Sequence, residues 1–207
     1  MKERILEKAQ ELFFRYGVKS VTMDDIAREL GISKKTIYQH FTDKDAMVYA
    51  GVLAHFDHER CVSEKMQAQA PDPIAEVVMA SEQLRQMLTG MNPTMIFDIK
   101  RYYPQAWVAF TEFKNGFILD NIRQNLKKGI EMGLYRGNLN VEVLAKLRNE
   151  EIELGFDAQI YPPQKFNLLE VQLAMLDHFL RGIVTSKGLK LYENYLENQL
   201  SVQLSEN

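Results

Sequence analysis

A run of basic and hydrogen-bonding side chains lies between Ser33 and Phe41, and no acidic residue interrupts it. On a short helix Ile37 and Phe41 would face inward, which leaves six residues facing outward: Lys34, Lys35, Thr36, Tyr38, Gln39 and His40. Ammonium, amide, imidazole and hydroxyl groups bind phosphate oxygens and base edges. The run therefore indicates DNA binding, and the alternative is a structural helical hairpin with a solvated basic end.

Two short helices and a tight turn are predicted to position this face. Thr22 begins the first helix and Ser33 the second, since both are favoured N-cap residues. Gly31 between them permits a left-handed turn conformation. Ala27 is small where the second helix crosses the first, and Ile37 fills the space between them. Together these features predict a helix-turn-helix.

The segment from Val21 to Met47, VTMDDIARELGISKKTIYQHFTDKDAM, resembles the N-terminal signature of the tetracycline-repressor (TetR) family of bacterial transcription regulators. The preceding helix extends the resemblance through four residues: Ala9, Leu12, Phe13 and Gly17. The resemblance implies an all-α homodimer with a three-helix DNA-binding head over residues 1–46. A helical ligand-binding and dimerisation body would follow over residues 47–207. The implied function is ligand-responsive transcription regulation, and we expect a repressor.

Carried over by position, the resemblance assigns DNA contact to seven residues: Lys34, Lys35, Thr36, Tyr38, Gln39, His40 and Lys44. We expect Lys35 and Gln39 to contact base edges, because Lys suits guanine O6 and N7 and Gln suits adenine. The other expected contacts are to phosphates, from Tyr38, His40 and Lys44. Thr22 adds a phosphate site, since a helix N-terminus offers backbone amides as well as the hydroxyl.

The rest of the chain also has helical periodicity, and no segment alternates as a strand would. Proline and glycine residues divide it into separate elements. We expect helices at seven ranges: 43–70, 73–90, 94–103, 105–132, 141–160, 167–186 and 189–204. The composition and pattern therefore indicate an all-α protein.

Methionine and aromatic residues are dense between Met79 and Tyr135. Core packing explains most of them, but adaptable Met-rich walls also form apolar ligand pockets. On the family resemblance we expect an effector pocket lined by six residues: Met87, Met91, Tyr103, Trp107, Phe110 and Phe113. We expect a small apolar or aromatic effector, with Tyr102, Tyr103 or Glu112 supplying a few polar contacts.

The segment 167–186 is apolar on most of its circumference, so it is expected to be buried on most sides. One side would pack in its own core and the other against a partner, with helix 141–160 completing a four-helix interface. The residues expected at this dimer interface are Leu173, Leu176, Phe179, Leu180 and Ile183.

Two polar clusters admit a second interpretation. Glu150, Glu153 and Asp157 could neutralise a cationic ligand, although a solvated or dimer-rim face is the preferred interpretation. Asp98, Lys100 and Arg101 are expected to form surface or inter-helix pairs. A third cluster, His55, His58 and Cys61, could hold Zn²⁺ or Cu⁺. Its spacing drifts around the helix, so we expect a polar flank and no metal or cofactor.

Composition sets further limits on the function. The 207 residues carry a net charge of −3, so DNA contact has to be local. The single Cys61 excludes an internal disulfide framework. Acids interrupt the first helix and no apolar run reaches about 18 residues, so we expect a cytoplasmic protein without a leader or membrane span. No nucleophile elbow, phosphate loop or zincin motif is present, so we do not expect an enzyme. The alternative is a helical enzyme or metal-binding protein with an incidental helix-turn-helix.

Overall fold

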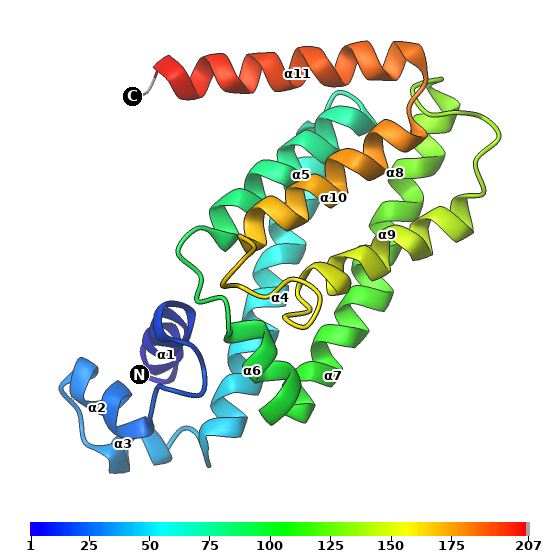
Figure 1. Ribbon diagram of the computed structural model, residues 1–207. Coiled ribbons are helices and arrows are strands. Elements are labelled where there is room, and N and C mark those ends of the chain that lie inside the picture. The colour runs from blue at the N-terminus through cyan, green and yellow to red at the C-terminus, as the bar shows by residue number, and fades with distance from the viewer. Residues whose placement is uncertain (206–207) are drawn as a thin grey trace.

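The computed structural model describes residues 1–205, with side chains through Asn198, and is helical throughout (Figure 1). Over that part of the chain the one β-type contact is an isolated bridge between Tyr135 and Val184. The helical head lies at one end of the molecule, and the last helix lies at the opposite end. The all-α prediction is confirmed.

Three helices form the head: α1 (Lys2–Tyr16), α2 (Met23–Leu30) and α3 (Lys34–Tyr38). Their apolar faces meet in one core, in which Ile5, Ile26 and Ile37 have no exposed surface. The turn after α1 uses Gly17 at φ 83°, as expected of a helix-ending glycine.

Helix α4 (Lys44–Gln69) begins in the head and continues through the body. Asp43 caps it, because its carboxylate accepts a hydrogen bond from Ala46 N at 2.7 Å. Met47 and Val48 of α4 lie in the head core. That core also contains three body residues: Ile99, Tyr103 and Ala106. The head and the body are therefore joined by continuous apolar packing.

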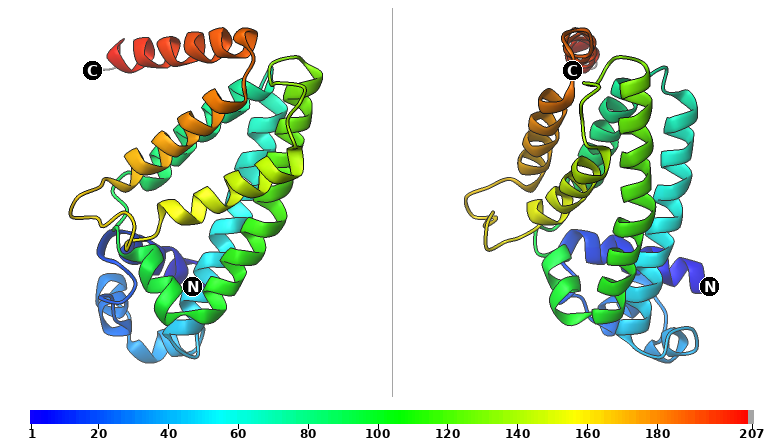
Figure 2. Two further views of the ribbon diagram at one scale, coloured as in Figure 1. Left: turned by 45° about the vertical axis from the view of Figure 1, so that its right-hand side comes forward. Right: turned by 90° about the vertical axis from the view of Figure 1, so that its right-hand side faces the viewer.

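The remaining helices form the body around α4 (Figure 2). Their bounds are α5 (Pro73–Leu88), α6 (Met95–Tyr102), α7 (Pro104–Phe113), α8 (Leu119–Glu131), α9 (Val141–Gly155), α10 (Leu168–Ile183) and α11 (Ser186–Ser205). A π-helical turn, η1 (Lys114–Ile118), connects α7 to α8 in one long helix. The body has its own core, centred on Ile74, Leu126 and Leu180. None of the described helices is long and apolar enough to cross a membrane.

Four of the expected helices differ clearly from the observed ones, and one of these, 167–186, ends early at Ile183. The expected helix 105–132 contains η1, which the sequence pattern did not reveal. The expected helix 141–160 ends at Gly155, where a Cβ would lie 2.4 Å from the Gln172 amide nitrogen. The expected last helix begins three residues early, because the Thr185 hydroxyl accepts a hydrogen bond from Gly188 N at 3.1 Å.

The expected dimer residues on α10 mostly face inward. Leu180 and Ile183 are 1% and 3% exposed and pack in the chain's own core. Leu176 and Phe179 line the internal cavity described below. Leu180 and Ile183 are therefore not available to a partner, whereas Leu176 and Phe179 keep partial exposure, and their place at a dimer interface stays a prediction. Leu173 is partly exposed.

Candidate nucleic-acid interface and body cavity

The turn between α2 and α3 has the geometry that the sequence predicted. Thr22 and Asp25 form a reciprocal capping box at the start of α2. Gly31 adopts φ 65° and ψ 32°, and open space surrounds the position that a Cβ would take. Glycine is therefore favoured there by backbone conformation and not by crowding. Ile37 is fully buried between the helices, which fixes the outward face of α3.

Three side chains stand free on that outward face. Lys35, Tyr38 and Gln39 are exposed, and none makes a hydrogen bond or ion pair to any residue that the structure describes. Thr36 differs, because its hydroxyl lies 2.9 Å from the hydroxyl of Ser33 in the helix cap. His40 is partly buried at the end of α3.

Lys34 lies on the same face but is paired within the chain. Its Nζ lies 2.8 Å from Oδ2 of Asp24, at the start of α2. The hydrogen bond that Lys34 donates to the Asp24 carboxylate raises the pKa of the Lys34 ammonium. An acidic side chain thus stands at the edge of an otherwise basic surface.

Lys44 is turned toward the protein interior. Its ammonium donates a hydrogen bond to the Val18 carbonyl oxygen and lies 5.8 Å from the Tyr103 ring centroid. Burial lowers the pKa of this amine. In this structure the amine joins the head to the body, and the expected phosphate contact of Lys44 stays a prediction.

The Thr22 hydroxyl also has an internal partner, since it donates a hydrogen bond to Oδ2 of Asp25 at 2.6 Å. The bonds from Thr22 lower the pKa of the Asp25 carboxyl, so a negative charge lies at the start of α2. A phosphate at this helix end would have to bind beside that carboxylate.

An elongated cavity of about 480 Å³ lies in the body and extends to the head, where Gln10, Phe13, Phe14 and Val18 also line it. Helix α4 lines it from Val48 to Met66, which is about 27 Å of helix at 1.5 Å per residue. Five of the six predicted pocket residues line it: Met87, Met91, Trp107, Phe110 and Phe113. Tyr103 does not, because it is 8% exposed within the core that joins head and body.

Stacked aromatic rings form one wall of the cavity. The Phe56 and Phe113 rings are parallel with centroids 4.3 Å apart, and the Phe113 and Phe117 centroids are 5.2 Å apart. Trp107 stacks on Phe110 at 4.8 Å. These contacts support the predicted apolar or aromatic character of the pocket.

The polar groups of the cavity are not the predicted ones. Tyr102 lies outside the cavity, where its hydroxyl is 3.3 Å from Lys19 Nζ, and Glu112 is also absent from the lining. The polar lining consists of Gln10, His55, Glu59, Ser63, Glu76, Gln83, Asn121, Asn125, Tyr135, Arg148 and Gln172. Sequence periodicity missed them because they come from six helices and, for Tyr135, from the loop after α8, which only the tertiary fold brings together.

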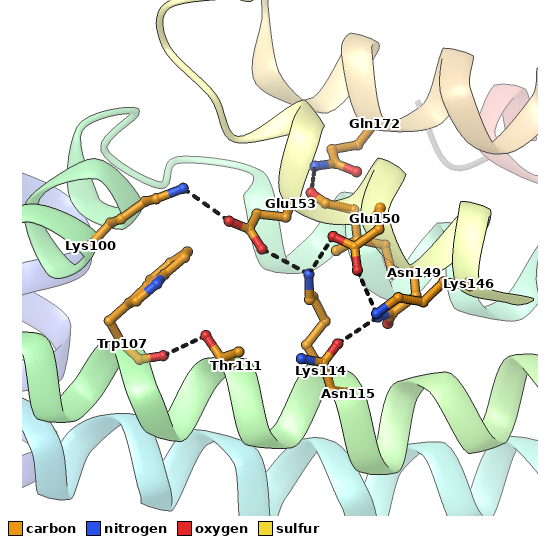
Figure 3. Close-up of polar contacts among 11 residues, drawn as sticks. Lys100, Trp107, Thr111, Lys114, Asn115, Lys146, Asn149, Glu150, Glu153 and Gln172 are labelled. Atoms are coloured by element: carbon orange, nitrogen blue, oxygen red, sulfur yellow. Dashed lines mark hydrogen bonds and ion pairs between the residues drawn. The ribbon is translucent and has the colours of Figure 1, made fainter.

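A buried cation lies beside this cavity, at the start of η1 (Figure 3). The Lys114 side chain is 2% exposed, and its Nζ lies 3.1 Å from Glu150 and 2.7 Å from Glu153 of α9. Glu153 also pairs with Lys100 of α6 at 2.9 Å. These ion pairs occupy two of the three carboxylates that were considered for a cationic ligand, Glu150 and Glu153, whereas Asp157 accepts a hydrogen bond from Gln159 N.

Helix α6 is bonded to the head as well. The buried Asp98 carboxylate accepts a hydrogen bond from Lys19 N at 3.0 Å, and Phe14 O accepts one from Asn92 N at 2.7 Å. With the Lys100–Glu153 pair, α6 connects the head to α9. A shift of α6 would therefore act on both.

The histidine cluster on α4 does not form a metal centre. Within the described residues, no group of three or more His, Cys, Asp or Glu side chains is arranged to hold a metal ion. His55 lines the cavity, and burial lowers the pKa of its imidazole.

The head thus defines the class of the protein: a helix-turn-helix transcriptional regulator, with a basic second helix presented outward. Residues 5–50 match the family model of bacterial regulatory proteins, tetR family. The uncharacterized HTH-type transcriptional regulator YvaF of Bacillus subtilis is 25% identical over 90% of this chain and 97% of its own.

Solved structures extend the match to the fold of the body. A TetR-family regulator from Agrobacterium tumefaciens has a TM-score of 0.71 at 16% identity, covering 89% of this chain and 97% of its own. A regulator from Saccharomonospora viridis in complex with choline has a TM-score of 0.69 at 19% identity, with 89% and 97% covered. Residues 5–50 thus match the tetR family of bacterial regulatory proteins, and the chain as a whole is similar to helix-turn-helix transcriptional regulators.

Proposed function

We propose that this protein is a dimeric repressor that leaves its operator when a small molecule binds in the body cavity. The observation that carries the proposal is the outward face of α3, where Lys35, Tyr38 and Gln39 are exposed without internal partners. Residues 1–46 would form the DNA-binding domain and residues 47–207 the ligand-binding and dimerisation domain. Of the latter, residues 206–207 lie outside the described part of the chain. DNA binding would place its action in the bacterial cytoplasm.

In this proposal α3 enters the major groove. Lys35 and Gln39 contact base edges, while Tyr38 and His40 contact phosphates. Thr22 would hold a further phosphate through the amides of α2, and Lys34 would do so only when released from Asp24. Two heads of a dimer would contact half-sites about 34–36 Å apart on a pseudo-palindromic operator.

The dimer contact is proposed on the outer side of α9. Val143, Leu147 and Leu154 are 60%, 50% and 39% exposed, and their spacing puts them on one side of the helix. Large exposed apolar side chains in a row favour a protein contact. A two-fold contact here would bury the row against itself, with the exposed side of α10 alongside.

Release would follow from α6. A ligand in the cavity touches Ile99 of α6 and Trp107 of α7, while the same short helix bonds the head through Asp98. A ligand that binds one position of α6 more tightly shifts the population toward it. If that position misplaces the heads, the operator is released.

Gel retention on the promoter beside the protein's own gene tests this proposal. Specific retention should weaken steeply with salt, because phosphate contacts release counterions. The double variant Lys35→Ala/Gln39→Ala should lose specific retention while keeping the thermal unfolding midpoint of the wild type. Equal retention of wild type and variant would contradict the assigned recognition helix.

A further inference from the structure

One cationic side chain forms part of the cavity wall. Arg148 of α9 lines the cavity and is 7% exposed. Its Nη1 lies 3.2 Å from Oε2 of Glu151, and that is its one hydrogen bond to the residues that the structure describes. Its Nε and Nη2 donors remain unused, yet neither is a fully enclosed orphan atom, so both retain accessible surface.

The charge on this group is permanent. Burial lowers the pKa of Arg148, but a guanidinium in a protein stays protonated. A guanidinium has five N–H donors in a planar fork that suits a carboxylate. A buried charge with unused donors is costly unless a partner completes its bonding. An anion in the cavity would supply that partner.

The acidic side chains in the cavity lining would favour a cation, but less strongly than Arg148 favours an anion. Burial raises the pKa of Glu76, which favours its neutral form, and Asn125 and Gln67 bond to it. Glu59 is partly exposed beside His55. The acids of α9 are occupied by Lys114, as described above. The fixed, buried and incompletely bonded charge of the lining is therefore positive.

The position of Arg148 along the cavity follows from helix register. Two ion pairs align α9 antiparallel to the long helix: Lys114–Glu150 and Arg123–Glu142. Arg148 is therefore level with Phe117. On α4, Arg60 lies 4.8 Å from the Phe117 ring centroid, so this level is near residue 60. From there the α4 lining continues down to Val48, about 18 Å at 1.5 Å per residue.

We propose that the cavity binds an amphipathic organic anion, whose carboxylate pairs with Arg148 and whose elongated apolar body lies along the aromatic section toward Trp107. This inference rests on the proposed ligand-binding function of the cavity. It names the chemical class of the effector and the residue that selects it. The apolar section would bind an aliphatic or aromatic body without further polar contacts.

Three twelve-carbon probes of different charge test this assignment on the full-length protein: dodecanoate, dodecanol and dodecyltrimethylammonium. Binding is followed by Trp107 fluorescence below the micelle concentration of each probe. Dodecanoate should bind roughly tenfold or more tightly than dodecanol, because a charged hydrogen bond is added. Tightest binding of the cation, or equal binding of anion and alcohol, would overturn the proposal.

Two variants on α9 then assign the selectivity to Arg148. Arg148→Met should lose roughly tenfold or more in dodecanoate affinity and keep its dodecanol affinity. Glu151→Gln should bind dodecanoate more tightly than wild type, because the guanidinium loses its internal partner. Arg85→Gln, an exposed change on α5, is the matched control and should change neither affinity.

These outcomes do not depend on Arg148→Met folding well. If that variant unfolds, the gain of affinity in Glu151→Gln and the probe order of the wild type still decide the question. An unchanged dodecanoate affinity in Glu151→Gln would contradict pairing with Arg148. Dodecanoate that binds through Arg148 without releasing DNA would refute the proposed switching function and leave this binding site intact.

Discussion

Lys35 and Gln39 are the residues for which the account predicts base contacts. Each has an exposed side chain on α3 and is free of internal partners among the described residues. We expect Lys35→Ala and Gln39→Ala each to weaken operator binding by about 1–3 kcal/mol and to relax specificity at one base pair. Lys65→Ala, an exposed change on α4, should leave the operator affinity and the base-pair specificity unchanged. Fluorescence anisotropy with single-base operator variants measures the effect.

Asp24 should act against DNA binding, because its carboxylate stands beside the basic face and holds Lys34. Asp24→Asn removes a charge that repels phosphate and frees a lysine to bind one. We expect severalfold tighter binding to the operator. The log–log slope of the binding constant against salt should become steeper by about one for each head, because one lysine is freed there. Asp57→Asn, remote on α4, should alter neither. Weaker binding by Asp24→Asn would show that the Asp24–Lys34 pair orients α3.

The residues of the site differ in how far sequence could predict them. The outward face of α3 depends on local helical periodicity, so its members could be identified from spacing alone. The position of Lys44 depends on Val18 and Tyr103, which lie 26 residues before and 59 residues after it in the sequence. The role proposed for the Arg148 donors could not be predicted from sequence either, because it depends on a cavity that several helices form.

At the scale of elements, η1 and α9 are joined by a buried ionic contact. Lys114 reaches two carboxylates of α9 from the first residue of the π-turn (Figure 3). Single π-turns inside longer helices occur often at functional sites. Because Glu153 also pairs with Lys100, the contact connects three elements: the long helix, α9 and α6, which is the helix proposed to move.

Removing the charge of Glu153 should loosen α6. Glu153→Gln keeps the side-chain shape but weakens the pairing of both lysines, one of which is 2% exposed. We expect a loss of about 1–2 kcal/mol in unfolding free energy, discounted because Glu153 is partly exposed. Amides of α6 should exchange faster with deuterium. Glu131→Gln, an exposed change on α8, is the control, and equal exchange in both variants would contradict the coupling.

The same contact has a defined pH dependence. Burial alone would raise the pKa of Glu153, but hydrogen bonds from Lys114 and Lys100 lower it overall. Its contribution is therefore complete above the ordinary glutamate pKa of about 4.3 and is lost as pH falls through the lower folded value. In urea unfolding, the difference in stability between wild type and Glu153→Gln should shrink as pH falls below the ordinary glutamate pKa of about 4.3.

Helix positions were largely predictable, and helix environments were not. Caps such as Thr22 and Ser33 act locally, so the starts of α2 and α3 matched. The π-turn has no local signal in the sequence. Its hydrogen bonds widen one turn of the helix, but the apolar pattern around that turn is regular. Both sides of α10 are apolar, so periodicity could not distinguish the side that packs in the chain's own core from a side that contacts a second copy. Leu180 and Ile183 were predicted at the dimer interface but lie in the core.

At the scale of the whole molecule, the proposed dimer depends on the exposed row of α9. Leu147→Glu would bury two carboxylates at the two-fold contact, and a buried unpaired charge is strongly unfavourable. We expect monomers in light scattering and a loss of operator affinity. Val108→Glu changes an equally exposed residue on α7 and should leave the dimer intact. An unchanged mass for Leu147→Glu would place the dimer contact elsewhere.

Head and body form one mechanical unit because a single apolar core joins them. Ile99, Tyr103 and Ala106 of the body pack with the head residues, so α6 cannot move without disturbing the base of the head. The cavity touches the same helix, because Ile99 also forms part of its lining. Ligand binding and DNA binding are therefore expected to be reciprocal: operator DNA should weaken effector binding by the factor by which effector weakens operator binding.

Selection of bound DNA from a random pool tests the central claim most directly. The account predicts one enriched pseudo-palindrome with half-site centres about one helical turn apart. The binding constant for the selected site should fall as salt rises, because a cationic face such as that of Lys35 displaces counterions from the DNA. The Lys35→Ala/Gln39→Ala protein should enrich no sequence. Failure of the wild-type protein to enrich any sequence, with a salt slope near zero, would contradict the account.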